Sequence, residues 1–251
     1  MARRRSRRRN FAGTRASIAV VDNEAVRTAV AGTGANSRFA ADADYYKHLR
    51  PALLTLFDAV PMTRVLEIGC GAGETLRYLR QRGAQYTVGV EIRGDVAELA
   101  KNGGTADAII VGDVETLDLP FPPEHFDLIV ASFVLEHVRD PWAVTRRLVS
   151  LLRPGGFLVG SLPNVRHWSV LAPLLFQGRW EYVDDGIMDW THFRFFTRRT
   201  IARLLSESGL QVDVNRGEVA GRKSTALNIA TLGVMSDFLA FAYNFRARKS
   251  S

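Results

Sequence analysis

An acidic residue followed by three alternating glycines is the feature of this sequence that most directly indicates chemistry. Residues 65–73 read Val-Leu-Glu-Ile-Gly-Cys-Gly-Ala-Gly. Glycine has no Cβ, so Gly69, Gly71 and Gly73 allow a sharp turn and a close approach of the backbone to a ligand. The carboxylate of Glu67 beside this turn favours a cationic ligand over a phosphate. The spacing E-x-G-x-G-x-G also differs from the G-x-G-x-x-G of dinucleotide-binding proteins.

Two further acids follow short apolar segments. Residues 87–90 indicate a strand that ends at Glu91, about twenty residues beyond the turn, where doubly wound folds place a carboxylate that binds a ribose diol. A second apolar run, residues 108–111, leads into Asp113. In open α/β sheets ligands bind outside the carboxyl ends of the strands. We therefore expect Glu67, Glu91 and Asp113 to gather at one edge of a sheet.

The rest of the chain alternates strand-like and helix-like segments, which predicts a doubly wound α/β fold. The apolar residues at 65, 66 and 68 suit a strand that is covered on both faces. In chain order, the other expected elements are a helix at 74–80, a strand at 126–131, a helix at 141–152, a turn at 153–156, a strand at 157–162, a helix at 198–208 capped by Thr197, and strands at 210–214 and 241–247. The pattern predicts a Rossmann-like, mostly parallel sheet of seven strands.

Two further apolar segments lie outside this alternation. Residues 42–60 have helical spacing, with an apolar face of Leu49, Leu53, Leu54 and Phe57, and Pro51 must begin or kink that helix. Residues 226–243 are mostly apolar, but Asn228 and Asp237 interrupt them, and the segment is too short and polar for a transmembrane span. We expect a core helix or a helix that faces a second copy in a homodimer, and a surface contact with a membrane stays open.

The basic charge of the chain is concentrated at its beginning. The formal net charge is +7, and six arginines supply most of it, namely Arg3, Arg4, Arg5, Arg7, Arg8 and Arg9. Residues 1–40 are rich in Arg, Ala, Ser and Gly, which predicts a flexible basic arm. The arm either binds phosphate groups of RNA, lipid or an acidic partner, or is a solvated tail. Nucleic acid is not the expected partner, because the remainder is nearly neutral.

The cysteine content indicates the compartment. Cys70 is the only cysteine, so an internal disulfide is excluded and a reducing, cytoplasmic location is expected. The arginine-rich stretch before the first acid, Asp22, also fits a mitochondrial presequence.

Residues 163–197 interrupt the alternation after the expected fifth strand. Three of the four tryptophans and two of the five histidines fall here. Amphipathic aromatic side chains beside a ligand site favour a binding surface or a lid that excludes water. We therefore interpret 163–197 as a substrate lid, although an insertion must also bury its own aromatic residues.

The acid and the three glycines resemble motif I of class I S-adenosylmethionine-dependent methyltransferases. The resemblance implies that residues 41–251 form a methyltransferase domain of the class I fold, with S-adenosylmethionine as cofactor. In that family an acid after the third strand hydrogen-bonds adenine, and Asp113 matches it. The implied cofactor contacts are Glu67, Gly69, Cys70, Gly71, Gly73, Glu91, Ile92, Asp113, Val114 and Ser132. The family's leading helix covers the cofactor, so Tyr45 and Tyr46 either touch its methionine part or pack on the sheet.

A second resemblance concerns the acceptor. Leu-Pro-Asn at 162–164 and the run at 186–197, Gly-Ile-Met-Asp-Trp-Thr-His-Phe-Arg-Phe-Phe-Thr, are similar to bacterial small-molecule methyltransferases related to the quinone O-methyltransferases. This resemblance implies methyl transfer to a hydroxylated small molecule, such as a sugar, glycolipid or natural-product intermediate. A quinone or phenol is the alternative acceptor. A non-catalytic methyltransferase-like partner protein and an RNA methyltransferase are weaker alternatives.

An alcohol acceptor must lose its proton, and histidine is the usual base near neutral pH. His192 in the lid ranks slightly ahead of His137 after the fourth strand, and Asp189 is expected to orient His192. Both histidines also have a purely structural interpretation. The residues expected to contact the acceptor are Asn164, His167, Trp168, Trp190 and Arg194.

A metal site is not expected. Some quinone O-methyltransferases carry an acid-x-x-Glu-His run that engages a divalent cation. Glu136 and His137 match the end of that run, but Phe133 stands where its first acid would be. So few local oxygens make a site for a hard cation improbable, and activity is expected to survive a chelator.

Overall fold

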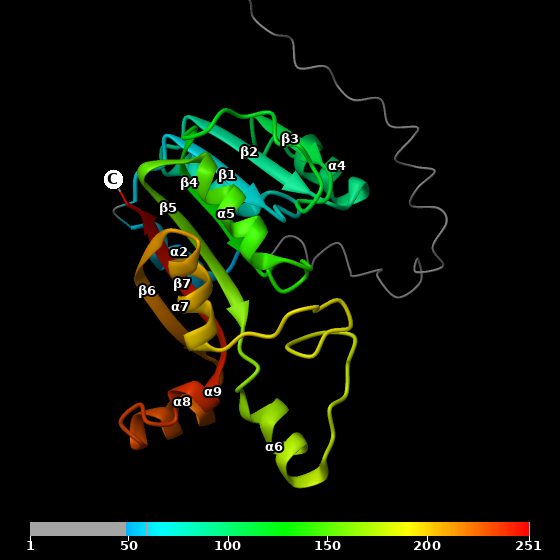
Figure 1. Cartoon of the computed structure of the whole chain (residues 1–251), viewed down its shortest axis with the longest axis vertical. Helices are drawn as coiled ribbons and strands as arrows, with labels where there is room; N and C mark the ends of the chain where they lie inside the picture. Colours follow the sequence, from blue (N-terminus) through cyan, green and yellow to red (C-terminus); the bar gives the residue numbers. More distant parts are fainter. Residues whose placement is uncertain (1–48, 59, 251) are drawn as a thin grey trace, which may run out of the picture. The chain divides into compact units, whose positions relative to one another are not determined.

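The computed structural model describes residues 49–58 and 60–250. Within them a single sheet has the strand order β3-β2-β1-β4-β5-β7-β6 (Figure 1). The strands are β1 (Arg64–Ile68), β2 (Tyr86–Glu91), β3 (Ala108–Val111), β4 (Phe126–Ser132), β5 (Leu152–Pro163), β6 (Leu210–Val219) and β7 (Ala240–Lys249). β7 runs antiparallel to both of its neighbours, and the other pairs are parallel. The predicted doubly wound, mostly parallel sheet of seven strands is confirmed.

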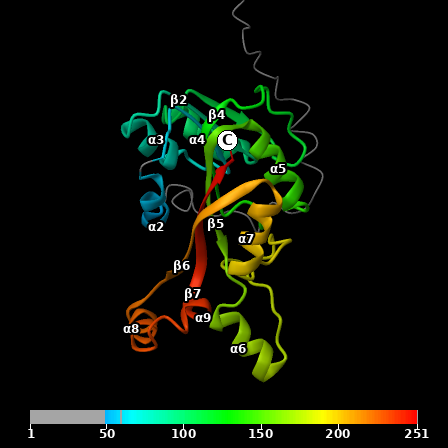
Figure 2. The ribbon, with the colours of Figure 1, turned by 60° about the vertical axis from the view of Figure 1, so that its left-hand side comes forward.

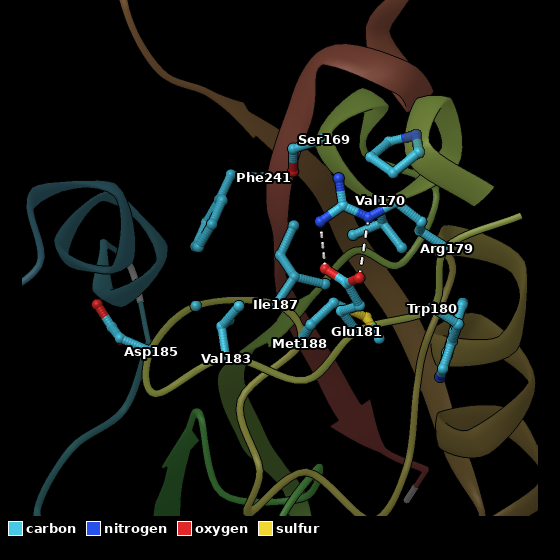
Figure 3. A pocket seen from close by; sticks show the side chains of 12 residues that line it. Ser169, Val170, Arg179, Trp180, Glu181, Val183, Asp185, Ile187, Met188 and Phe241 are labelled. Atoms are coloured by element: carbon cyan, nitrogen blue, oxygen red, sulfur yellow. Dashed lines mark hydrogen bonds and ion pairs between the residues drawn. The ribbon is translucent and has the colours of Figure 1, made fainter. Parts of the chain in front are cut away.

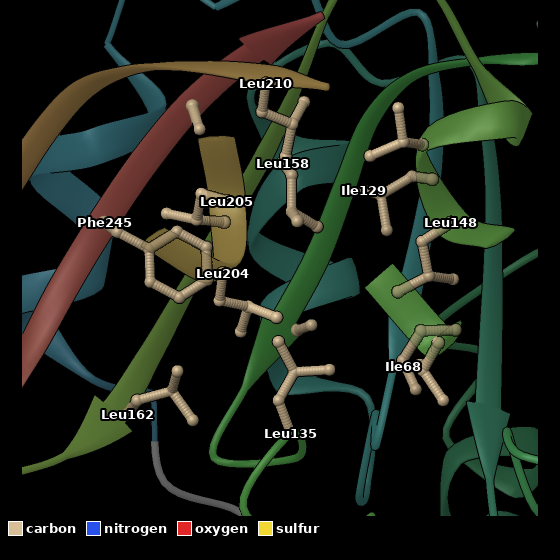
Figure 4. Packing of buried hydrophobic residues seen from close by; sticks show 14 of the residues in the cluster. Ile68, Ile129, Leu135, Leu148, Leu158, Leu162, Leu204, Leu205, Leu210 and Phe245 are labelled. Atoms are coloured by element: carbon tan, nitrogen blue, oxygen red, sulfur yellow. The ribbon is translucent and has the colours of Figure 1, made fainter. Parts of the chain in front are cut away.

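Helices cover both faces of this sheet, and α6, α8 and α9 lie beyond its end (Figure 1). The helices of the described residues are α2 (Pro51–Leu54), the 3₁₀ helix η2 (Thr55–Phe57), α3 (Glu74–Gln81), α4 (Gly94–Asn102), α5 (Pro141–Leu151), α6 (Trp168–Gln177), α7 (Arg198–Glu207), α8 (Arg222–Ala230) and α9 (Ser236–Leu239). α5 and α7 contribute to one apolar cluster, while η2 and α3 contribute to another with different strand residues. In α7, Leu204 and Leu205 lie three and four residues after Ile201, so all three face the sheet (Figure 4).

Three expectations about local structure were wrong. The expected turn at 153–156 is part of β5, where the pairing with β4 jumps from Phe126–Leu152 to Leu128–Phe157. Gly155, with φ of 74°, lets the extra residues bulge out of the ladder. Of the helix expected over 42–60, residues 42–48 lie outside the described residues, and Pro51 begins α2 as expected; the part expected beyond η2 is wrong, because the chain is extended again at residue 58. Tyr45 and Tyr46 lie outside the described residues.

The third correction concerns the apolar segment at 226–243. α8 ends at Ala230 and has no buried residue, so it is not a core helix. The strand β7 already begins at Ala240. Whether this helix faces a second copy stays a prediction.

The segment 163–197 connects β5 to α7 and contains α6. Its two ends meet in an isolated bridge between Asn164 and Phe196, and the amide of Val165 donates to the carbonyl of Phe196 at 2.9 Å. α6 extends away from the end of β5, and Figure 2 shows it at the same end of the domain as α8 and α9. The role of this segment as a lid stays a proposal.

Candidate functional site

The glycine turn follows β1 as predicted, and its conformation requires glycine. Gly69, Gly71 and Gly73 have φ angles of 67°, 55° and 85°. A Cβ added to Gly69 would lie 2.6 Å from a methyl carbon of Val134, and one added to Gly73 would lie 2.0 Å from Oγ1 of Thr105. α3 begins directly after the turn. The backbone is therefore left open toward the edge of the sheet where ligands of such folds bind.

Glu91, at the end of β2, is attached to this turn. One carboxylate oxygen accepts from the amide of Gly71 at 2.9 Å, and the other accepts from the amide of Arg93 at 3.0 Å. The side chain is only 5% exposed. The acid expected to hold a ribose diol thus lies against the loop expected to approach the cofactor.

Glu67, in β1, is buried beside Glu91. Burial is the main cause that raises the pKa of Glu67 to about 8, and the charge of Glu91 adds to it. Its Oε2 has no hydrogen-bond partner among the described residues. A buried carboxyl of this kind gains from a nearby cation, so this observation fits a cationic ligand at the turn.

The carboxyl ends of β2 and β3 complete this edge of the sheet. The amide of Gly112 donates to the carbonyl of Glu91 at 2.9 Å, which places Asp113 beside the end of β2. Asp113 is half-buried, and its carboxylate accepts a hydrogen bond from the amide of Glu115. Of the two other residues expected to contact the cofactor here, Val114 is buried and Ile92 is 64% exposed. Because β1, β2 and β3 are parallel neighbours, the acids predicted from three separate segments lie along one edge.

The loop after β4 brings buried polar atoms to the neighbouring part of this edge. Oγ of Ser132 and both carboxylate oxygens of Glu136 are buried and have no hydrogen-bond partner among the described residues. Burial raises the pKa of Glu136 to about 8. Phe133 adopts φ of 56°, and the guanidinium carbon of Arg50 lies 4.0 Å from the centre of its ring. Arg50 was missed by sequence reasoning, and its only signal was its position directly before the helix that leads into β1.

Two histidines from separate segments meet at this loop. The rings of His137 and His192 lie 4.7 Å apart, edge to face. Oγ1 of Thr191 donates to the carboxylate of Asp189 at 2.6 Å and lies 2.9 Å from Nδ1 of His137. Nδ1 of His192 lies 2.9 Å from the carbonyl of Ile187. Asp189 therefore supports His137 through Thr191, which corrects the expectation that it orients His192.

The same histidines and Glu136 could also hold a metal. One ligand atom from each of Glu136, His137 and His192 lies within 4.8 Å of the others. Two imidazoles and a carboxylate form a donor set that suits transition metals. In such a site His192 would supply a donor in place of the acid that is absent at Phe133, and metal independence stays a prediction.

Some residues expected to contact the acceptor have structural partners. Asn164 is fully buried, and its amide donates to the carbonyls of Asp237 and Ala240 at 2.7 and 2.8 Å. The guanidinium of Arg194 donates to the carbonyl of Arg139, and this contact holds the segment 163–197 against the loop after β4. These contacts position the segment, because they occupy the polar groups that an acceptor would need.

The other expected acceptor residues lie at the surface of the segment. His167 caps α6 by accepting from the amide of Ser169. Trp168 and Trp190 are 54% and 56% exposed, and Trp190 stacks on Tyr182 with ring centres 5.1 Å apart. The structure does not bring these three side chains together with Arg194 and Asn164 as one contact set.

A cavity of about 360 Å³ lies between α6 and residues 179–188. Its apolar lining includes Val170, Ile187, Met188 and Phe241 (Figure 3). Its polar lining includes Asp185 and the ion pair between Arg179 and Glu181, and Trp180 also lines it. Sequence reasoning missed this cavity, because it marked the histidines and tryptophans of the segment rather than its aliphatic residues.

Comparisons with known proteins agree with this geometry. A family profile described as a methyltransferase domain matches residues 39–214. The ubiquinone biosynthesis O-methyltransferase of Neisseria meningitidis serogroup C is 28% identical over 163 residues, which cover 61% of this chain and 66% of that protein. The malonyl-[acyl-carrier protein] O-methyltransferase of Salmonella typhimurium is 27% identical over 194 residues, with 73% and 75% covered. The chain thus spans slightly less than two thirds of the first relative.

A solved structure shows the same fold. The S-adenosylmethionine-dependent methyltransferase of Mesorhizobium loti superposes with a TM-score of 0.59 at 23% identity and covers 83% of this chain and 99% of that one. The strand order, the glycine turn and the acids near the ends of β1, β2 and β3 fit S-adenosylmethionine as cofactor, because a cation suits the buried carboxyl of Glu67, whose Oε2 has no hydrogen-bond partner among the described residues. On these grounds the chain belongs to the methyltransferase domain family.

Proposed function

We propose that this enzyme moves a methyl group to a hydroxyl oxygen of a small molecule, with His137 as general base. The observation that carries the proposal is the chain from Asp189 through Thr191 to Nδ1 of His137. Because the Thr191 hydroxyl donates to Asp189, its oxygen accepts from Nδ1–H of His137, and Nε2 keeps a lone pair. Burial and the neighbouring His192 lower the pKa of His137, so the ring stays neutral and can accept a proton.

Methyl transfer requires few other contributions from the protein. Bound S-adenosylmethionine supplies a methyl group on a sulfonium, so transfer requires an aligned oxygen nucleophile and a site without competing water. The cofactor held at this edge would supply the methyl group from its sulfonium and would leave as the neutral thioether, while Nε2 of His137 would take the proton that the acceptor hydroxyl loses. The two O-methyltransferases among the relatives support oxygen as the acceptor atom.

The cofactor contacts of the proposal follow from the edge described above. Glu91 would hold the ribose, Asp113 the adenine, and Glu67 would face the cationic methionine end. We add Arg50, because its guanidinium lies over Phe133 and lowers the pKa of Glu136 from a position beside the same loop. A cation there suits the carboxylate of the cofactor's methionine part.

The acceptor we propose is a sugar, a glycolipid or a natural-product intermediate. Trp180 and Asp185 line the cavity, and an aromatic ring and a carboxylate suit the apolar face and hydroxyls of a sugar. Both oxygens of Glu181 accept from Arg179, and neither His137 nor His192 lines this cavity. A quinol or phenol is the second candidate, which the name of the Neisseria relative favours. A reducing, cytoplasmic location remains part of the proposal, with Cys70 as a free thiol.

Single-turnover methyl transfer tests the base. With a panel of sugar, glycolipid and phenolic acceptors, we expect His137→Gln to slow transfer by about 10²–10⁴-fold at unchanged cofactor affinity. Thr191→Val should slow it less, because the imidazole keeps its carbonyl contact with residue 191 at 3.2 Å. His125→Gln is the matched control, since that ring packs on Phe121 and Phe126 at the start of β4.

The outcomes separate the alternatives. If His137→Gln leaves the transfer rate unchanged and His192→Gln lowers it, then His192 is the general base. Unchanged rates for both variants would remove base catalysis from the proposal. Cofactor binding without transfer to any acceptor would favour a non-catalytic partner protein.

A further inference from the structure

Glu115 joins the cofactor edge to the loop that carries His137. Its backbone amide donates to a carboxylate oxygen of Asp113 at 2.8 Å. Its side-chain Oε1 accepts from the amides of Arg139 and Asp140, at 2.9 and 3.1 Å. One residue thus contacts the acid that we propose for the adenine through its main chain, and the loop after β4 through its carboxylate.

Arg194 contacts the same point of that loop. The carbonyl of Arg139 and the amide of Asp140 belong to one planar peptide group, and in a trans peptide they point in opposite directions. The carbonyl accepts from two nitrogens of the Arg194 guanidinium at 2.9 and 2.5 Å, while the amide donates to Glu115. A carboxylate and a guanidinium therefore hold this group from its two ends, in charge-assisted hydrogen bonds. We call it the clamped peptide.

The clamped peptide fixes the loop just after His137. The residue between them, Val138, is buried in the main apolar cluster of the domain. Just before His137, the carbonyl of Glu136 accepts from the amides of Phe193 and Arg194 at 2.8 and 3.1 Å. His137 therefore lies between two points at which the loop is hydrogen-bonded to other segments of the chain.

The helix α5 connects the clamped peptide to the cofactor edge a second time. Asp140 is the N-cap of α5, and its carboxylate accepts from the amide of Ala143 at 2.9 Å. From the same helix, the guanidinium of Arg147 donates to the carbonyl of Val114. Residues 113–115 thus contact both the loop after β4 and the helix that follows it. Hydrogen-bond networks and rigid elements of this kind carry coupling between sites.

We propose that Glu115 and Arg194 are positioning residues that couple occupation of the cofactor edge to the placement of His137. Contacts of the cofactor with Asp113 order residues 113–115. Glu115 passes that order to the clamped peptide, and Arg194 passes it on to the segment 163–197. The inference rests on the proposed function, in which His137 is the general base. Methyl transfer depends on such placement, because a displacement of about 1 Å can lower a rate by about 10²-fold.

Kinetics of Glu115→Ala test the proposal, because this change removes the carboxylate and keeps the backbone amide that donates to Asp113. We expect nearly unchanged affinity for S-adenosylhomocysteine, measured by calorimetry, and single-turnover methyl transfer that is slower by about 10- to 100-fold. Glu115→Gln keeps an oxygen that accepts from both amides, so it should restore most of the rate. Arg194→Ala should also slow transfer. The double alanine variant should be no slower than the slower single variant, because both side chains act on one peptide group.

Amide hydrogen exchange measures the coupling without turnover. In the wild-type protein, S-adenosylhomocysteine should slow exchange in residues 112–117, in residues 137–143 and in residues 183–194. In Glu115→Ala the ligand should still protect residues 112–117, but it should no longer protect the other two stretches. In Arg194→Ala only the protection of residues 183–194 should disappear, because the contact of Glu115 with the clamped peptide remains.

Two matched controls change the same kinds of side chain outside the clamp. Asp118 is an exposed carboxylate three residues after Glu115, and Arg199 is an exposed arginine of α7. Asp118→Ala and Arg199→Ala should leave ligand affinity, transfer rate and exchange as they are in the wild-type protein.

Three results would overturn the proposal. The first is exchange in residues 137–143 that the ligand changes equally in the wild-type protein and in Glu115→Ala, or in neither. The second is a transfer rate that Glu115→Ala leaves unchanged or that Glu115→Gln does not restore. The third is a loss of ligand affinity in Glu115→Ala as large as its loss of rate. Failure of the proposed function is distinguishable, because it appears as an unchanged rate in His137→Gln, while the exchange measurement does not depend on which group is the base.

Discussion

At the scale of single residues, the buried carboxyl of Glu67 couples cofactor binding to pH. Its pKa of about 8 means that it is mainly protonated at pH 7 in the ligand-free protein, and a cation beside it lowers that pKa. We expect binding of S-adenosylmethionine at pH 7 to release up to about one proton, and affinity to rise with pH toward 8. Calorimetry in two buffers with different ionisation enthalpies measures this proton directly.

The matched variant is Glu67→Gln, which should bind without releasing the proton. The same raised pKa affects folding: its stabilising contribution is fully present below the unfolded pKa, near 4.5, and is lost as the pH rises through about 8. Between about pH 4.5 and pH 8 the free energy of unfolding of Glu67→Gln should therefore fall less than that of the wild-type protein. Equal proton release by the wild-type protein and the variant would contradict the assignment of Glu67.

The cluster of Glu136, His137 and His192 raises the question of metal dependence at the same scale. We keep the prediction that dialysis against a chelator leaves methyl transfer unchanged, because a neutral His137 is sufficient as base for an alcohol. The measurement is the single-turnover rate before and after dialysis, together with metal analysis of the purified protein. A rate that falls and recovers with one particular divalent ion would show that the three side chains are ligands.

At the scale of elements, we expect the stability of the protein to depend on the conformation of the glycine turn. Gly73→Ala forces a Cβ to within 2.0 Å of Oγ1 of Thr105 at φ of 85°, so it adds a clash to backbone strain. Gly83→Ala is the control, because φ there is 105° but no atom lies within 4 Å of the added Cβ. We expect about 1–2 kcal/mol of destabilisation from strain at Gly83 and clearly more at Gly73, measured by urea unfolding.

Cofactor binding should separate the two glycine variants further. Gly73→Ala moves the start of α3 and the turn, so S-adenosylmethionine affinity should fall, whereas Gly83→Ala should bind normally at temperatures where it is folded. Equal effects of the two substitutions on stability and on binding would show that the turn does not depend on the contact with Thr105.

The elements around the cofactor site could be predicted from the sequence because each of them is fixed locally. β1, β2 and β3 are short apolar runs, and each has its acid within two residues of its carboxyl end. The bulge within β5 could not be predicted, because Pro154 and two glycines have the composition of a turn, and it is the pairing of Leu152 and Phe157 on either side of them with β4 that makes them a bulge within one strand. Propensity was overruled there by tertiary contacts.

The partners within the segment 163–197 were harder to predict for the same physical reason. The contact of Asp189 with His137 joins residues more than fifty positions apart through Thr191, and Arg50 reaches Phe133 from a different element. Side-chain contacts of this length depend on the folded arrangement of the loops and leave no periodic pattern. The two histidines that the sequence singled out lie together, and their catalytic role stays a prediction, whereas the side chain of Asp189 contacts Thr191 and not His192.

At the scale of the whole molecule, the division of charge predicts that catalysis and the N-terminal arginines are separable. Deleting residues 1–9 lowers the formal net charge from +7 to +1 and leaves every described residue of the cofactor edge in place. We expect the cofactor affinity and the single-turnover rate of the truncated protein to match those of the full chain at physiological ionic strength, where charges more than about 8 Å apart are largely screened.

Nucleic-acid affinity, if the full chain has any, should disappear with the same deletion, because phosphate contacts by arginine dominate such binding and weaken with salt. Titration of a labelled RNA against both proteins at two salt concentrations measures this. Methyl transfer that falls with the deletion would place the arm within the catalytic cycle. RNA binding that persists at +1 net charge would instead locate a nucleic-acid surface on the methyltransferase domain itself.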